Sequence, residues 1–171
     1  MNKIDLHKYF IECPFNYVII RRPDIFPAYQ TNTDIDIISD NKDIVVDYSM
    51  KFSKKYDDLN FNPIQRPSGH FHIDIYNLDG SLNLKLDFVF NVGVYKKVAL
   101  DKKLFDDILK YKIVTSEGIY APDIKYELLI RYLEYIENID ERPDKIKHLN
   151  YIKNYPNGEK IVMELMKDYN I

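Results

Sequence analysis

The sequence predicts a mixed α/β fold, in which a sheet flanked by helices is followed by a helical region. Two observations predict this class. In the first half of the chain, short apolar runs typical of strands alternate with apolar residues at helical spacing. After Asn91, helical spacing dominates. We therefore expect an α/β core over residues 1–92 and a helical region over residues 93–171 that packs on this core.

Each expected element of the core has a local signal. Pro14 ends a loosely helical N-terminal pattern, because the residue before a proline disfavours helix. The run YVII at 17–20 is rich in residues that favour strands. Asp40 and Asn41 can cap the helix that follows them. The expected elements are a helix over 4–11, strands over 17–20 and 34–38, a helix that ends at Lys55, and a strand over 59–65.

A hairpin is expected around Asp79-Gly80, which joins HFHIDIYNL to SLNLKLDFVF. The Asp-Gly pair favours a two-residue type I′ turn, which would place Leu78 opposite Ser81. Counting back from this turn sorts the two strands into one polar face and one apolar face. The expected polar pairs are Tyr76 with Asn83, Asp74 with Lys85 and His72 with Asp87; the apolar pairs are Ile75 with Leu84, Ile73 with Leu86 and Phe71 with Phe88.

Four helices are expected in the second half, over residues 101–110 and after Pro122, Pro143 and Gly158. In the third of these, apolar spacing predicts that its basic side chains face solvent and that the inward residues are Ile146, Leu149 and Ile152.

The composition excludes several classes of protein. The chain of 171 residues has a formal net charge of −3, so it lacks the positive surplus of proteins that bind duplex nucleic acid. A single cysteine, Cys13, excludes an internal disulfide and a multi-cysteine zinc site. No segment has the apolar length of a signal peptide or a membrane span. We therefore expect a cytoplasmic protein without a membrane partner, in an oligomeric state that the sequence leaves open.

Three carboxylates are the candidates for chemistry. Asp34 and Asp36 are two residues apart on an expected strand, so their side chains share one face, with isoleucines on the other. Asp87 lies on the polar face of the expected hairpin. If the two strands are neighbours, the three acids form an oxygen-rich site suited to Mg²⁺ or Mn²⁺ and to phosphoryl transfer. The plainer interpretation is a solvated polar face of a half-covered sheet.

The motifs Thr33-Asp34-Ile35-Asp36-Ile37-Ile38 and Leu84-Lys85-Leu86-Asp87-Phe88-Val89 resemble those of the nucleotidyltransferase superfamily that includes the polymerase beta-like enzymes. The resemblance covers roughly residues 15 to 92 and implies a mixed sheet flanked by helices, often followed by a helical region. It also implies that Asp34 and Asp36 bind catalytic metal ions. It implies that Asp87 helps to bind metal and to activate the acceptor hydroxyl.

The chain departs from this family at its first motif. Where the family has glycine-serine after the first strand, this sequence has Ile20-Arg21-Arg22-Pro23. Small bacterial nucleotidyltransferase-like proteins associated with surface polysaccharides are similar in having an arginine here, which makes Arg21 or Arg22 a candidate phosphate ligand. A solvated basic turn explains the two arginines equally well.

Three further residues are candidates for nucleotide binding: Thr33, Lys85 and His72. Lys85 shares a strand face with Asp87, so it either contacts phosphate or neutralises Asp74. His72 and His70 alternate with Asp74, a spacing that a transition-metal site would also show. A hydrogen bond from His72 to Asp87 is the simpler interpretation.

The predicted function is metal-dependent transfer of a nucleoside monophosphate, from ATP or another nucleoside triphosphate to an unidentified acceptor, with release of pyrophosphate. The acceptor is a small molecule, a sugar phosphate or a protein side chain. One alternative is a sugar-nucleotide glycosyltransferase that uses the D-x-D motif, although only about 30 residues precede Asp34. The other is a nucleotide-binding remnant of the same fold without catalysis.

Overall fold

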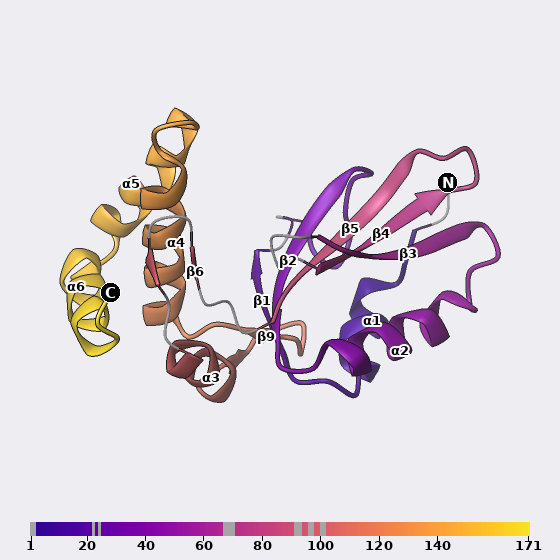
Figure 1. Cartoon of the computed structure of the whole chain (residues 1–171), viewed down its shortest axis with the longest axis horizontal. Coiled ribbons are helices and arrows are strands. Elements are labelled where there is room, and N and C mark those ends of the chain that lie inside the picture. Colours follow the sequence, from indigo (N-terminus) through magenta and orange to yellow (C-terminus); the bar gives the residue numbers. More distant parts are fainter. Residues whose placement is uncertain are drawn as a thin grey trace. The chain divides into compact units, whose positions relative to one another are not determined.

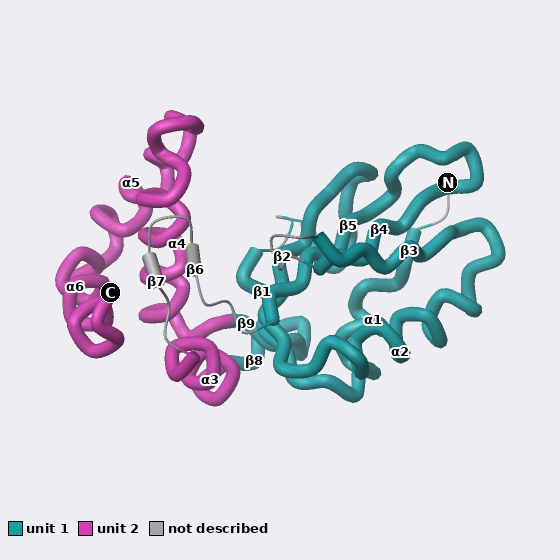
Figure 2. The backbone as a smooth tube through the Cα atoms, in the orientation of Figure 1, with its two compact units in different colours: residues 1–91, 113–121 teal, residues 92–112, 122–171 magenta. Residues whose placement is uncertain are grey.

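The computed structural model describes residues 3–21, 23, 25–66, 71–90, 94–95, 98–99 and 102–171 (Figure 1), with backbone alone for 94–95 and 98–99. The chain divides into two compact units (Figure 2). Unit 1 comprises residues 1–91 and 113–121, and unit 2 comprises residues 92–112 and 122–171.

Unit 1 is built on a five-stranded mixed sheet of order β1-β2-β5-β4-β3. The central strands β2 and β5 are parallel, and the other neighbours are antiparallel. This architecture confirms the predicted mixed α/β class. The elements are α1 (Leu6–Glu12), β1 (Tyr17–Arg21), β2 (Thr33–Ser39), α2 (Lys42–Ser53), β3 (Leu59–Gln65), β4 (Phe71–Asn77), β5 (Leu82–Val89), β8 (Ile113–Val114) and β9 (Tyr120–Ala121).

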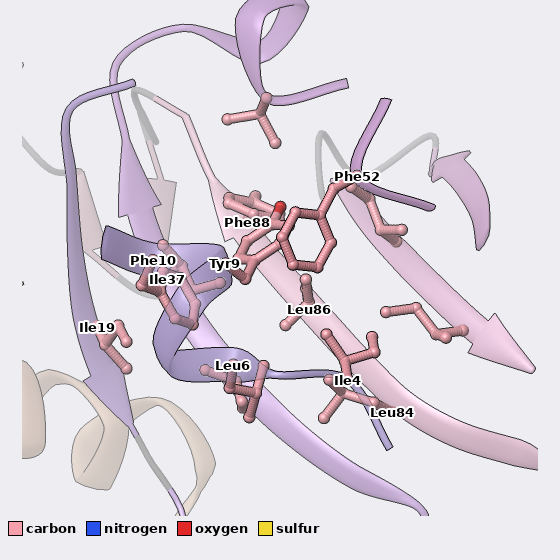
Figure 3. Packing of buried hydrophobic residues seen from close by; sticks show 14 of the residues in the cluster. Ile4, Leu6, Tyr9, Phe10, Ile19, Ile37, Phe52, Leu84, Leu86 and Phe88 are labelled. Atoms are coloured by element: carbon pink, nitrogen blue, oxygen red, sulfur yellow. The ribbon is translucent and has the colours of Figure 1, made fainter. Parts of the chain in front are cut away.

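The hydrophobic core lies on one face of this sheet, where side chains of α1 and α2 meet those of the strands (Figure 3). Tyr9 of α1 packs edge-on against Phe52 of α2, with ring centroids 5.1 Å apart. The strand residues of the core alternate along each strand, because successive side chains point to opposite faces. Those on β2, β4 and β5 are Ile35, Ile37, Phe71, Ile73, Ile75, Leu84, Leu86 and Phe88.

The hairpin between β4 and β5 differs from the predicted two-residue turn. Gly80 N–H donates to Asn77 O, Asn77 N–H donates to Ser81 O, and Gly80 has a φ of +81°. The loop therefore has three residues, of the kind in which a turn is followed by a left-handed glycine. The expected pair Leu78 with Ser81 is wrong by one residue.

A second irregularity corrects that shift. Tyr76 lies opposite Leu82 rather than Asn83, while Ile75 lies opposite Leu84, so Asn83 is an extra residue in β5. For the pairs from Ile75 back to Phe71, the two irregularities cancel, so the register is the predicted one. The remaining expected pairs are confirmed, including Asp74 with Lys85 and His72 with Asp87.

Unit 2 is mainly helical. Its elements are β6 (Val94–Tyr95), β7 (Val98–Ala99), α3 (Lys102–Lys110), α4 (Ile124–Asn138), the 3-10 helix η1 (Pro143–Lys145), α5 (Ile146–Asn154) and α6 (Gly158–Asp168). None of the helices in the described ranges is long and apolar enough to cross a membrane.

Of the three residues predicted to face inward in α5, Ile152 is buried and Leu149 is partly buried, but Ile146 is not. Ile146 is 42% exposed, whereas Lys145 and His148 are buried. The reason is Glu134 of α4, which forms an ion pair with the Lys145 ammonium and has its Oε2 3.5 Å from Nε2 of the His148 ring. Lys145 is buried together with this carboxylate, because a buried charge without a partner of opposite sign is costly.

Candidate functional site

The register of β2 and β5 brings the three predicted acids onto one face of the sheet. Asp34 lies opposite Lys85, and Asp36 lies opposite Asp87. Paired residues of neighbouring strands point to the same side, so these four side chains share a face. It is the face away from Ile35 and the core. We call Asp34, Asp36, Lys85 and Asp87, together with Arg21, the carboxylate face.

Two cations neutralise much of the negative charge on the carboxylate face. Arg21 stands opposite Asp36 on β1, where the pairing is irregular after Ile19, and its Nη1 lies 3.0 Å from Asp36 Oδ2. Lys85 Nζ lies 3.3 Å from Asp34 Oδ2 and 3.6 Å from Asp87 Oδ2. Three carboxylates and two cations leave the face with one net negative charge.

Lys85 is the most enclosed cation of the face. Its side chain is 23% exposed, against 49% for Arg21. Partial burial lowers the pKa of Lys85, but attraction to Asp34 and Asp87 outweighs burial, so the pKa of the ammonium is raised above its usual value. Lys85 is therefore charged at neutral pH.

The three acids differ in exposure. The Asp34 side chain is 51% exposed, whereas those of Asp36 and Asp87 are each 20% exposed. Asp87 Oδ1 is buried and has no hydrogen-bond partner among the described residues. A carboxylate oxygen in this position favours a cation or a proton donor beside it.

On β4, His72 and Asp74 extend the polar face, with contacts that differ from the expected ones. Lys85 turns to Asp34 and Asp87, so the expected ion pair with Asp74 is wrong. Asp74 Oδ2 instead accepts a hydrogen bond from Tyr76 OH, with 3.0 Å between the oxygens.

His72 is 2% exposed. Within the described part of the chain, its hydrogen bond is with Arg66 rather than with Asp87: Arg66 Nε donates to His72 Nε2 at 3.4 Å. Arg66 was not among the predicted site residues. It directly follows β3, so the pairing of β3 with β4 brings it near His72, and the sequence alone does not show that pairing.

Thr33 does not join this cluster. Thr33 alternates with Asp34 along β2, and its hydroxyl donates to Gln30 O at 2.6 Å. Arg22 and His70, two further candidates from the sequence, lie outside the described residues.

The possible metal ligands of the carboxylate face are of the kind that a hard divalent ion prefers, because they are carboxylate oxygens on two neighbouring strands. One of these oxygens, Asp87 Oδ1, is buried and has no hydrogen-bond partner among the described residues. As the side chains lie, however, Asp36 contacts Arg21, and Asp34 and Asp87 contact Lys85. Within the described ranges, no three acids, histidines or cysteines lie close enough together to hold a metal ion. The ammonium of Lys85 occupies a position that attracts a cation.

Comparison with known proteins yields a distant likeness. No family model and no curated protein matches the chain. Two crystal structures are similar to it, a "putative nucleotidyltransferase from H. pylori" and "JHP933 from Helicobacter pylori". The first is 11% identical, with a TM-score of 0.42, over 96% of this chain and 76% of that chain. The second is 11% identical, with a TM-score of 0.41, over 96% of this chain and 75% of that chain. A likeness of this degree carries no information on activity, substrate or metal.

Proposed function

We propose that the protein is a metal-dependent nucleotidyltransferase, which transfers a nucleoside monophosphate from a nucleoside triphosphate to an acceptor. The observation that supports this most is the register of β2 and β5, in which Asp36 lies opposite Asp87 and Asp34 lies two residues before Asp36 on the same face. Oxygen ligands on two rigid strands are what a hard cation bridging to phosphate requires.

In this proposal, Asp34, Asp36 and Asp87 hold Mg²⁺ or Mn²⁺ together with the triphosphate. The bound ion would polarise the phosphate and stabilise the charge that develops during transfer. The residues of the chain would supply ligands and positive charge, since this transfer depends on positioning and charge neutralisation rather than on a protein nucleophile.

The transfer step conserves atoms and charge in the following way. An oxygen of the acceptor forms a bond to the α-phosphorus, and the bond from that phosphorus to the α–β bridging oxygen breaks. Pyrophosphate leaves with the electron pair, and the acceptor hydroxyl gives its proton to Asp87 or to water. Arg21 is the cation whose planar fork suits the oxygens of the leaving phosphates.

The experiment is a comparison of wild-type protein with Asp36→Asn and Asp87→Asn in Mg²⁺ and each nucleoside triphosphate, with pyrophosphate release measured over a panel of acceptors. These variants remove a ligand charge and keep the side-chain volume. Asp47→Asn is the matched control, because Asp47 is an exposed acid of the same unit that pairs with Lys51. We expect release by wild type and Asp47→Asn, and a loss of at least about a hundredfold in the other two.

Other outcomes would contradict the proposal. Release of a nucleoside diphosphate from a sugar nucleotide would favour the glycosyltransferase. Metal-dependent nucleotide binding without release from any acceptor would favour the nucleotide-binding remnant. Absence of metal and nucleotide binding would exclude all three.

A further inference from the structure

Lys85 occupies the centre of the carboxylate face in a way that a simple phosphate-binding lysine does not require. Its ammonium contacts two of the three acids, Asp34 at 3.3 Å and Asp87 at 3.6 Å. Arg21, by contrast, has an ion pair with Asp36 and is twice as exposed. A divalent ion on Asp34 and Asp87 would need the oxygens that Lys85 now holds.

We propose that Lys85 is an internal counter-cation, which a divalent ion must displace and which thereby sets the affinity of the carboxylate face for metal. This inference rests on the proposed function, because it concerns the same metal ligands.

The physical basis is competition between two cations for the same oxygens. Without a partner, Asp34 and Asp87 would repel each other across two neighbouring strands, and Asp87 is mostly buried. Lys85 removes that repulsion. A metal ion that takes its place gains the carboxylates but must break two ion pairs and is repelled by the ammonium while it remains nearby.

The displaced side chain gains a second role. Lys85 stands on β5 two residues before Asp87, so its flexible stem keeps the ammonium beside the metal ligands after it leaves them. Released from Asp34 and Asp87, it is available to a triphosphate oxygen. Removal of its charge should therefore tighten metal binding and weaken nucleotide binding, two effects of opposite direction that a purely structural lysine would not produce.

The test is titration with Mn²⁺ alone, followed by electron paramagnetic resonance, on wild type, Lys85→Gln and Lys85→Arg. We expect Lys85→Gln to lower the Kd for Mn²⁺ about tenfold, and Lys85→Arg, which keeps the charge, to stay within about threefold of wild type. Lys51→Gln is the control, because it removes the same charge from an exposed lysine–aspartate pair of the same unit. Its Kd should equal that of wild type.

A second titration, with ATP at saturating Mn²⁺, should give a Kd about tenfold higher for Lys85→Gln than for wild type. Lys85→Met, which keeps the aliphatic stem, is measured alongside in case the glutamine variant does not fold.

The outcomes separate the two proposals. Equal Mn²⁺ affinity in wild type and in the neutral variants would overturn the role of Lys85 and leave the metal site standing. Weaker Mn²⁺ binding in the neutral variants would overturn it as well, since Lys85 would then support the site. Absence of Mn²⁺ binding in every variant would overturn both the inference and the proposed function.

Discussion

Asn83 illustrates how a single buried amide holds the strand that carries Lys85 and Asp87. It is fully buried, and its Oδ1 accepts a hydrogen bond from Tyr29 OH at 2.7 Å. Its Nδ2 donates to Asn77 Oδ1 at 2.7 Å. These bonds fix the extra residue of β5, which restores the register on which the carboxylate face depends.

Replacement of Asn83 by Ala should therefore lower the free energy of unfolding by about 2 to 3 kcal/mol, because it leaves the buried Tyr29 hydroxyl and Asn77 amide oxygen without these partners. The measurement is urea denaturation. Asn60→Ala, at an exposed position of β3, is the control and should change the free energy by less than about 0.5 kcal/mol. A similar loss in both variants would contradict the role given to Asn83.

Side-chain partners were the least predictable feature at this scale. Strand alternation correctly predicted that Lys85 would share a face with Asp87, because that follows from the period of a strand. It could not predict which carboxylate the ammonium contacts. Asp74 lies opposite on β4, yet Lys85 turns to Asp34 on the other neighbouring strand.

At the scale of elements, the sequence predicted the existence of the helices and strands of the core better than their fine register. The alternation of apolar residues identifies both strands of the β4–β5 hairpin. The type of turn was not recoverable, because Asp-Gly suits a two-residue turn as well as the last two residues of the three-residue loop seen here. The pairs near Asp87 were nevertheless correct, since the extra residue Asn83 compensates for the longer loop.

At the start of α5, Ile146 was mispredicted for a different reason, although Ile152 is buried as expected. Periodicity counts a lysine or histidine as polar, so it placed Ile146 inside and Lys145 outside. The structure reverses this, because Glu134 of α4 provides a buried partner for Lys145. The burial of Lys145 depends on a contact with another helix, which the residue pattern of its own segment does not show.

This ion pair leads to a prediction for unit 2. Glu134→Gln should lower the free energy of unfolding of unit 2 by about 3 kcal/mol, because it leaves the buried Lys145 ammonium without this carboxylate. The measurement is chemical denaturation followed by circular dichroism. Glu164→Gln breaks the exposed Lys160–Glu164 pair of α6 and should cost less than about 0.5 kcal/mol. If the two substitutions had equal effects, the buried Lys145–Glu134 pair would stabilise unit 2 no more than the exposed pair of α6.

At the scale of the whole molecule, buried tyrosines make stability depend on alkaline pH. Tyr9, Tyr17 and Tyr29 are each at most 1% exposed, and burial raises the pKa of all three phenols. Between the unfolded and folded pKa values, the unfolded chain loses protons that the native state keeps. The free energy of unfolding should therefore fall as pH rises above about 10, by at most about 1.4 kcal/mol per pH unit for each such tyrosine.

The Tyr9→Phe variant tests this directly. It should reduce the fall of unfolding free energy between about pH 10 and 11 by about 1 kcal/mol, because Tyr9 is about half ionised in the unfolded chain at pH 10. Its stability at pH 7 should be about 1 kcal/mol lower, because the hydrogen bond between Tyr9 OH and Ser49 Oγ is lost. Urea denaturation at several pH values gives both quantities. An unchanged slope would mean that Tyr9 ionises equally in the two states.

The central claim is that the carboxylate face binds a divalent ion in place of the Lys85 ammonium. The most direct measurement is a crystal structure of the protein with Mn²⁺, with the metal located by its anomalous scattering. We predict a manganese ion about 2.2 Å from carboxylate oxygens of both Asp34 and Asp87, with Lys85 Nζ moved away from both. A structure in which manganese is absent from this face, while Lys85 still contacts Asp34 and Asp87, would contradict the claim.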